Sequence, residues 1–505
     1  MESIDYVWVL FCTVLVLNMQ TAFCCLEVGL VRSKNSVNVV VKNLFDFCVV
    51  VLVFTVIGFY LITGLSPIDL LLGHASAKEV VSFVFQLAFC ATSASIISGA
   101  VAERTRLYAY ALIVFVVTAV IYPIFASSVW GVNESGVRGW LANIGFIDYA
   151  GSTVVHSIGG WVALAAVLVI GPRLGRFDEK KPIEGHNIPL AVVGVFFFFI
   201  GWIGFNGGIE NSFTENVPFI VLNTIIAGTS GGVAALLVSH LVFGRINVRY
   251  LIGSVIGGLV AITAGVHVFV PLTSIVVGGI SSLVLLVGIV VLEKLRIDDA
   301  VDAIPMHLCC GIWGTLAVPI FADTTLLNTG LNTFSQILVQ FSGIIIAGLW
   351  AFVPTYFLFK LLNMLIPFRV SEADEKLGLN IAEHESTTEL IDLLHEMEKH
   401  AIHGEFDKKL SVEPHTEIGQ IAQQYNRVLE KVNAEANRAT ENQLKSDKAK
   451  LEAQLSRDAM ETQISELQEF NRHAINREVK MRKLKILVND LCQKLGEPPQ
   501  FDISS

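Results

Sequence analysis

Charged side chains are scarce in the first part of this 505-residue chain. Residues 1–366 contain only 35 Lys, Arg, Asp and Glu, whereas the 139 residues from 367 to 505 contain 45. Soluble domains carry about a quarter charged residues, so the first part is not an ordinary soluble enzyme. All seven Trp and 36 of the 40 Gly also lie in it. The contrast predicts a membrane domain over residues 1–366 followed by a water-exposed region.

The sequence also lacks the patterns of a metal site, a disulfide framework or a nucleotide-dependent catalytic domain. Seven of the eight Cys lie in apolar runs, and their spacing matches neither zinc binding nor paired disulfides. We find no Asn- and Gly-rich boxes of an ATP-binding domain and no Gly-Gly-acidic motif of a cyclase. We therefore expect no metal, no cofactor, no nucleic-acid partner and no enzymatic activity.

Apolar runs of roughly the length that crosses a bilayer occur eleven times in the first part. We therefore expect an all-α membrane protein with eleven transmembrane helices, arranged as an inverted five-plus-five repeat plus one. The runs lie near residues 5–31, 43–64, 80–100, 107–128, 150–170, 189–209, 217–243, 250–265, 271–293, 302–321 and 336–366.

The loops between these runs alternate in charge. Alternate loops hold 13 Lys and Arg, whereas the intervening loops hold only Lys78 and Arg138. The positive-inside rule therefore predicts a multi-pass protein of the inner (plasma) membrane, with its N-terminus outside and its polar tail in the cytoplasm. The acidic N-terminus lacks a basic n-region, so we expect the first run to be a span rather than a cleaved signal peptide.

Two of the predicted spans, the fifth and the tenth, contain a histidine that follows an aspartate. One reads Asp148 to His156 and the other Asp298 to His307, and they occupy corresponding places in the two five-helix halves. An odd number of helices per half would invert the second, which is a common transporter design with its site at the midplane. A lone buried histidine usually has a structural role, but this symmetry favours a functional imidazole pair along a narrow pore.

Aspartate and aromatic residues near these spans have two interpretations. The side chain of Asp148 could cap the fifth span by accepting hydrogen bonds from the backbone N–H groups at the start of that helix. It could also attract a cation, and the two roles are compatible. Phe89, Phe205 and Trp130 could bind a small cation through their rings, although each taken singly is more often a packing residue.

These residues resemble the ammonium transporter (Amt/Rh) family, and the resemblance covers about residues 1–385. The matching motifs are Gly99-Ala-Val-Ala-Glu-Arg104, Asp148-Tyr-Ala-Gly-Ser-Thr-Val-Val-His156, Gly201-Trp-Ile-Gly-Phe-Asn-Gly-Gly208, Asp298-Asp-Ala-Val-Asp-Ala-Ile-Pro-Met-His307 and Arg369-Val-Ser-Glu372.

The resemblance implies a homotrimer in membrane lipid with one pore per subunit for ammonium, ammonia or methylammonium. It implies that Trp130, Phe89 and Asp148 recruit the substrate. It further implies that Phe89 and Phe205 form a gate, and that His156 and His307 are the twin histidines of the pore.

Three features depart from the family pattern. Ile209 stands where a recruiting Ser is common, so that hydroxyl is lost unless Ser212 or another group replaces it. Leu308 stands where Gly often follows the second histidine, and residues 132–138 form an insertion. These departures concern substrate affinity and flux rather than the fold.

The polar region reads as a series of helices. Residues 367–386 resemble the C-terminal segment of the family. Residues 387–434, a helix, a connector and a second helix that opens with Glu-Ile-Gly, resemble a HAMP signalling module. Residues 435–505 have heptad-like apolar positions, and no Pro occurs from 415 to 497, which predicts a coiled-coil signalling helix. A trimerisation stalk is the simpler alternative.

The sequence thus favours an ammonium sensor-transporter that passes ammonium occupancy to a cytoplasmic helix array and to a separate signalling protein. A plain ammonium transporter with a regulatory or oligomerisation tail is one alternative. A non-conducting ammonium receptor is another, motivated by Ile209 and Leu308.

Overall fold

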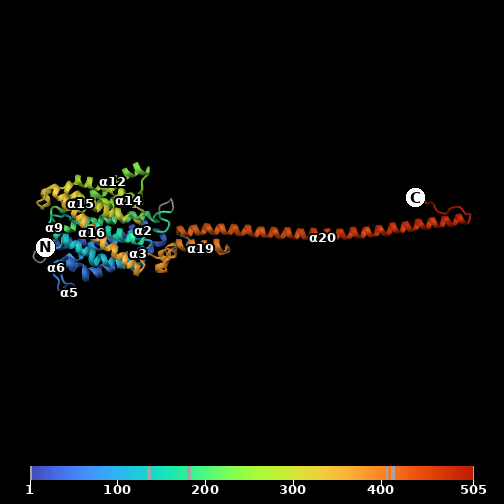
Figure 1. Ribbon diagram of the computed structural model, residues 1–505, viewed down its shortest axis with the longest axis horizontal. Coiled ribbons are helices and arrows are strands. Elements are labelled where there is room, and N and C mark those ends of the chain that lie inside the picture. The colour runs from blue at the N-terminus through green and yellow to red at the C-terminus, as the bar shows by residue number, and fades with distance from the viewer. Residues whose placement is uncertain are drawn as a thin grey trace. The chain divides into compact units, whose positions relative to one another are not determined.

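The computed structural model describes residues 3–132, 138–178, 183–387, 389–404, 406, 408–410 and 416–503. The chain divides into two compact units, Met1–Thr388 and Glu389–Ser505, which are coloured from blue to orange and from orange to red in Figure 1. Most of the predicted insertion at 132–138 and part of the predicted HAMP connector lie outside the described residues.

The first unit is a bundle of apolar helices (Figure 1). Nine helical segments in its described residues are long and apolar enough to cross a membrane, and Val248–Ile262 and Pro305–Phe321 are shorter apolar helices. Each coincides with one predicted run, so the all-helical membrane fold is confirmed, while eleven as the number of spans stays a prediction. The main helices are α1 (Ser3–Leu17), α2 (Met19–Leu30), α3 (Ser36–Val53), α4 (Phe59–Thr63), α6 (Ala77–Ala100), α7 (Leu107–Val116), α8 (Tyr122–Trp130), α10 (Ile158–Ile170), α11 (Ile188–Gly207), α12 (Val217–Phe243), α13 (Val248–Ile262), α14 (Pro271–Lys294), α15 (Cys310–Phe321) and α16 (Thr333–Leu365).

Several spans are not regular α-helices. The first predicted span is interrupted between α1 and α2, and π-helical turns precede or join other helices. Such wide turns are uncommon and frequently lie at functional sites. They are η2 (Phe54–Gly58), η3 (Val117–Ile121), η4 (Ser152–Ser157) and η6 (Pro305–Cys309).

Glycine lets α12, α13 and α14 approach each other closely. A Cβ built on Gly258 or Gly278 would overlap the carbonyl oxygen of Ala227. The backbones are therefore in contact at this place, as expected for small residues at helix interfaces in membranes.

A buried ion network joins three loops of the first unit. Arg173 Nε and Nη2 lie 2.8 Å from the two carboxylate oxygens of Asp298, and Arg173 Nη1 lies 3.2 Å from Glu103 Oε2. Burial alone would raise the pKa of both acids, but the guanidinium groups hold each pKa below its ordinary value. The predicted basic loops are thus partly neutralised within the fold.

Residues 367–387 belong to the first unit and pack beside its membrane helices. They form α17 (Glu372–Leu377) and α18 (Leu379–His384). Lys34 Nζ donates to the carbonyl oxygen of Glu375 at 2.7 Å, and the backbone N–H of Leu379 donates to Asn35 at 2.9 Å. This segment is therefore attached to the loop before α3.

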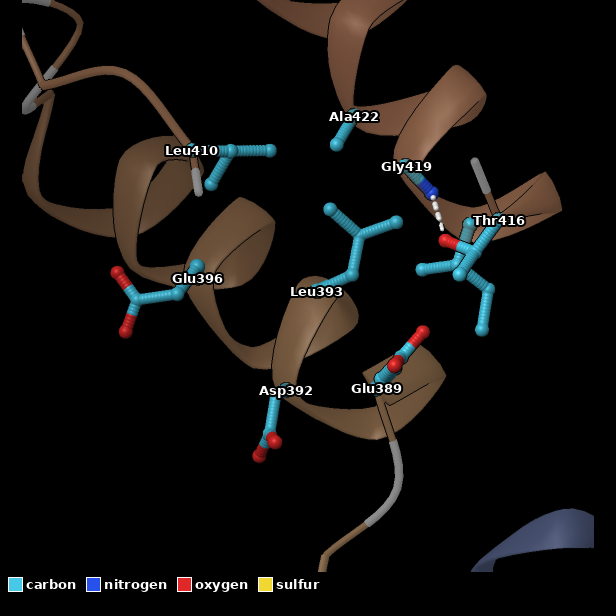
Figure 2. Close-up of a pocket in the computed structure, with 9 residues that line it drawn as sticks. Glu389, Asp392, Leu393, Glu396, Leu410, Thr416, Gly419 and Ala422 are labelled. Atoms are coloured by element: carbon cyan, nitrogen blue, oxygen red, sulfur yellow. Dashed lines mark hydrogen bonds between the residues drawn. The ribbon is translucent and has the colours of Figure 1, made fainter. Parts of the chain in front are cut away.

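The second unit consists of α19 (Glu389–His403) and the 78-residue α20 (Glu417–Lys494). A groove of about 210 Å³ lies between α19 and the start of α20, and Leu393, Leu410 and Ala422 line it. In Figure 2, Leu393 points toward Ala422, whereas the carboxylates of Asp392 and Glu396 point away from it. The side chain of Asn426 accepts a hydrogen bond from the backbone N–H of Leu410 at 2.8 Å and donates one to the carbonyl oxygen of Leu410 at 3.0 Å.

Helix α20 has no break from residue 417 to residue 494. The side chain of Thr416 accepts a hydrogen bond from the backbone N–H of Gly419 at 2.9 Å and so caps the helix (Figure 2). Most of its apolar side chains are exposed, including Val428, Leu467 and Leu484. The predicted HAMP module and coiled-coil signalling helix of the tail stay predictions.

Candidate functional site

Two histidines face each other inside the first unit. His156 lies in η4 before α10, and His307 lies in η6 before α15, with 0% and 2% of their surfaces exposed. Their Nδ1 atoms are 3.2 Å apart, and their rings are within 19° of parallel. The fold therefore brings together two residues that are 151 positions apart in the sequence, as the repeat pattern predicts.

Asp148 holds the turn that carries the first histidine. Its Oδ2 accepts hydrogen bonds from the backbone N–H groups of Thr153 at 2.8 Å and Val154 at 2.7 Å, and its Oδ1 accepts one from Gly151 at 3.2 Å. The carboxylate thus satisfies the free N–H groups of η4, which is the capping role.

Asp299 has the same role in the second half, which the sequence reasoning missed. Its Oδ2 accepts a hydrogen bond from the backbone N–H of Ile304 at 2.6 Å, before η6. Asp148 precedes His156 by eight residues, and Asp299 precedes His307 by eight. This equal spacing was the available signal. The neighbouring Asp298 instead pairs with Arg173, and Asp302 pairs with Arg249.

Aromatic rings continue from the histidine pair in one direction. The ring of Phe205 lies 5.4 Å from that of His156, and Phe89 contacts Phe205 edge to face at 4.1 Å. Trp130 follows Phe89 at 5.8 Å, and its indole N–H donates to the carbonyl oxygen of Asp148 at 2.9 Å. Five of the predicted site residues therefore form one series of contacts, which we call the ring column: Trp130, Phe89, Phe205, His156 and His307.

Two further aromatic side chains complete this series. Trp202 stacks on His156 with ring centroids 5.0 Å apart, and its N–H donates to Thr263 at 2.9 Å. The ring of Phe23 lies 6.1 Å from that of His307. The sequence reasoning did not select Phe23, because one Phe within an apolar run carries no local signal.

A surface cavity opens beside Trp130. It has a volume of about 910 Å³, and its lining includes Trp130 and the acidic side chains of Asp69 and Glu79. Carboxylates on the wall of a cavity raise the local concentration of cations. The cavity is therefore suited to deliver a small cation to the ring column.

Two of the three departures from the family pattern, Ile209 and Leu308, lie at different parts of the site. Ile209 is partly buried in the short turn η5 (Gly208–Glu210), which directly follows α11 and Phe205. Ser212 Oγ donates a long hydrogen bond of 3.4 Å to the carbonyl oxygen of Glu210. Leu308 is buried against Gly160. A Cβ built on Gly160 would lie 2.7 Å from the Cβ of Leu308. Gly160 therefore makes room for Leu308.

Several known proteins are similar to this chain over most of its length. A protein of Synechocystis sp. (sll0537) is 41% identical over 462 residues, which cover 87% of this chain and 84% of that protein. Ammonium transporter Amt2 of Archaeoglobus fulgidus is 39% identical over 75% of this chain and 87% of its own length. A solved structure described as a sensor Amt protein has a TM-score of 0.73 and 36% identity, over 75% of this chain and 98% of that one.

The family comparison covers most of the first unit and includes every residue of the ring column. The sequence model of the Ammonium Transporter Family matches residues 7–389. Members of this family are transporters or channels rather than enzymes. The chain belongs to the ammonium transporter family.

Proposed function

We propose that this protein is an ammonium sensor-transporter: it conducts ammonium along the ring column and relays ammonium occupancy to its helical tail. The observation that carries the proposal is the continuous contact from Trp130 through Phe89 and Phe205 to the His156–His307 pair. In this proposal Trp130, Phe89 and Asp148 recruit the cation, and the two Phe form the gate.

The chemistry of each part suits a small cation that can lose a proton. Aromatic faces attract ammonium through their quadrupole and replace part of its hydration. Phe rings in edge-to-face contact exclude water, and a buried neutral imidazole offers one donor and one acceptor to ammonia or ammonium. We expect three copies to assemble, with the N-terminus outside and the tail in the cytoplasm of the inner membrane.

The second unit supports the sensing part of the proposal. An unbroken helix of 78 residues that exposes apolar side chains along its length is suited to pair with other helices and to transmit a movement. The similarity to a solved structure described as a sensor Amt protein also supports this role. A separate cytoplasmic protein would receive the signal.

An electrical measurement on liposomes tests the transport part. We expect the full chain to give ammonium-dependent currents that potassium at the same concentration does not produce. A version of residues 1–386 should give the same currents, because the ring column lies wholly within the first unit. Absence of current in both, with ammonium binding intact, would make the protein a non-conducting receptor.

Spin labels on the tail test the sensing part. With labels at exposed positions of α20, such as Val428 and Leu467, we expect ammonium to change the distance distribution between copies or the label mobility, whereas potassium should not. Unchanged spectra in a conducting protein would leave a plain transporter with an oligomerisation stalk.

A substitution at Ile209 tests the predicted loss of a recruiting hydroxyl. We expect Ile209→Ser to lower the ammonium concentration for half-maximal current by about two- to tenfold, because one hydrogen bond contributes about 0.5–1.5 kcal/mol. Ile209→Ala is the matched control, since it removes the same bulk without adding a hydroxyl. An equal shift in both variants would assign the effect to bulk alone.

A further inference from the structure

Two carboxyl groups outside the ring column are buried within the helices of the first unit. Glu27 on α2 is 2% exposed, and Asp46 on α3 is 0% exposed. Neither takes part in an ion pair among the described residues. Lys42, one turn before Asp46, instead donates to the carbonyl oxygen of Thr105. Unpaired carboxylates are costly inside a membrane protein and are functional candidates by default.

Polar side chains on α3 connect the two carboxyl groups. Asn43 Nδ2 donates to Glu27 Oε2 at 2.9 Å, and Asp46 lies three residues after Asn43. Residues three apart on a helix share a face, with their Cβ atoms about 5–6 Å from each other. Glu27 therefore approaches α3 within one turn of Asp46.

Two serines of helix α6 also contact the two carboxyl groups. Ser98 Oγ donates to Glu27 Oε1, and Ser95 Oγ lies 3.4 Å from Asp46 Oδ2. Tyr110 on α7 donates its hydroxyl to that same oxygen of Asp46 at 2.6 Å. We call the set of Glu27, Asn43, Asp46, Ser95, Ser98 and Tyr110 the carboxyl cluster.

Two acceptor atoms of the carboxyl cluster have no hydrogen-bond partner among the described residues. Asp46 Oδ1 and Asn43 Oδ1 are buried and accept no hydrogen bond from the described residues, although the other polar atom of each side chain is bonded within the cluster. A buried polar atom without a partner costs about 1–3 kcal/mol and points to a group that binds there. A group that donates N–H or O–H bonds would satisfy these oxygens, and a positively charged one would also offset the buried carboxylates.

The cluster lies beside the far end of the ring column. Phe23, which contacts His307, is on the same face of α2 as Glu27, one helical turn earlier. Gly99 of α6 faces Glu27, and a Cβ there would lie 3.2 Å from Glu27 Oε1. Glu27 therefore lies one turn of α2 from the side chain that contacts His307.

We propose that the carboxyl cluster is a second cation site. It receives one positive charge, either the ammonium ion or its proton, after the histidine pair. The charge arrives as a bound ammonium ion, whose N–H groups donate to Asp46 Oδ1 and Asn43 Oδ1, or as its proton alone. In the second case an N–H bond breaks, its electron pair stays on ammonia, and an O–H bond forms on a carboxylate, which becomes neutral. The identity of the cation rests on the proposed function, whereas the two buried carboxyl groups and the unpartnered oxygens do not.

Infrared difference spectroscopy on the full-length protein in liposomes tests this site. Potassium chloride is exchanged for ammonium chloride at constant pH and ionic strength, and the carboxylate and carboxylic acid bands are followed. We expect a band change in the wild type that is lost in Asp46→Asn and in Glu27→Gln. Asp178→Asn, at an exposed loop position, is the matched control and should keep it.

A second exchange distinguishes the two forms of the charge. If ammonium delivers a proton, it should increase the carboxylic acid band in the same way as acidification in potassium chloride does. If the ion itself binds, the carboxylate band should shift without a gain of the acid band. Either result supports the site, whereas no band change in the wild type, or an unaltered change in both variants, overturns it.

Ammonium currents from the same liposomes keep this proposal separate from the proposed function. A conducting wild type without a band change refutes the second site alone, and a band change without current refutes transport alone. Tyr110→Phe guards against misfolding of Asp46→Asn, because it removes only one donor to Asp46 and should shift the band rather than abolish it.

Discussion

Replacing His307 with alanine is expected to lower the ratio of ammonium to potassium current by at least about tenfold, a change of about 1.4 kcal/mol in relative barrier height. In the wild type, two nearly parallel imidazoles with Nδ1 atoms 3.2 Å apart fill the space beyond Phe205. Alanine leaves room for water there, so a hydrated potassium ion no longer has to lose its shell. His156→Ala should have the same direction of effect.

Currents from reconstituted liposomes measure this ratio, and size-exclusion chromatography checks that the assembly persists. His240→Ala is the matched control, because His240 is exposed on α12, away from the ring column. Unaltered ammonium and potassium currents in both pore variants would contradict a functional role for the histidine pair and leave it as a packing feature.

Replacing Arg173 with alanine should cause a large loss of stability. Its guanidinium group contacts Asp298 and Glu103, and all three side chains are at most 1% exposed. Removing the cation leaves two buried carboxylates without this partner, and breaking a buried pair in this way costs about 3–5 kcal/mol. We expect a fall of several degrees in the thermal unfolding midpoint of the detergent-solubilised protein.

An exposed ion pair provides the control for Arg173. Lys376 pairs with Glu372 on the surface of α17, where both side chains are more than half exposed. Lys376→Ala should leave the midpoint nearly unchanged, since such pairs contribute little. An equally small effect of Arg173→Ala would show that water or a rearranged loop compensates for the lost cation.

The same network predicts how stability depends on pH. The Arg173 guanidinium holds the pKa of Asp298 below its ordinary value despite burial. Arg173 and Arg32 together hold the pKa of Glu103 below its ordinary value as well. Groups with a depressed pKa stabilise the folded state at pH values above their unfolded pKa, near 4, and lose this contribution as the pH falls toward the folded pKa. Thermal stability should therefore fall on acidification below about pH 4, and less steeply in Arg173→Ala.

Local sequence predicted the spans well because each depends on an apolar run that must cover the bilayer core. The predicted runs at 217–243 and 271–293 agree with α12 and α14 to within one residue. The shorter runs were less exact, since α13 ends at Ile262 rather than near 265. After Ile262 the backbone N–H groups of Thr263 and Gly265 bond to the carbonyl oxygens three residues earlier, and hydropathy does not contain such a change of hydrogen bonding.

The candidate site was predictable where the two halves repeat each other. His156 and His307 follow from the symmetric placement of Asp and His, and the contact of Phe89 with Phe205 follows from the family resemblance. Asp299 was missed because two other aspartates stand beside it, and only hydrogen bonds to the η6 backbone distinguish it from Asp298. Glu27 and Asp46 were missed because single acids within apolar runs do not show which helix faces they share.

The sequence by itself determined which region lies in the membrane and which lies in water. Scarcity of charge placed residues 1–366 in the membrane, and the absence of Pro allowed a long helix in the tail, because hydrophobicity and backbone hydrogen bonding are local properties. Only the tertiary structure decided which side chains meet. The stacking of His156 on Trp202, the burial of Arg173 between two acids, and the open oxygen of Asp46 arise from helices far apart in sequence that pack at fixed angles.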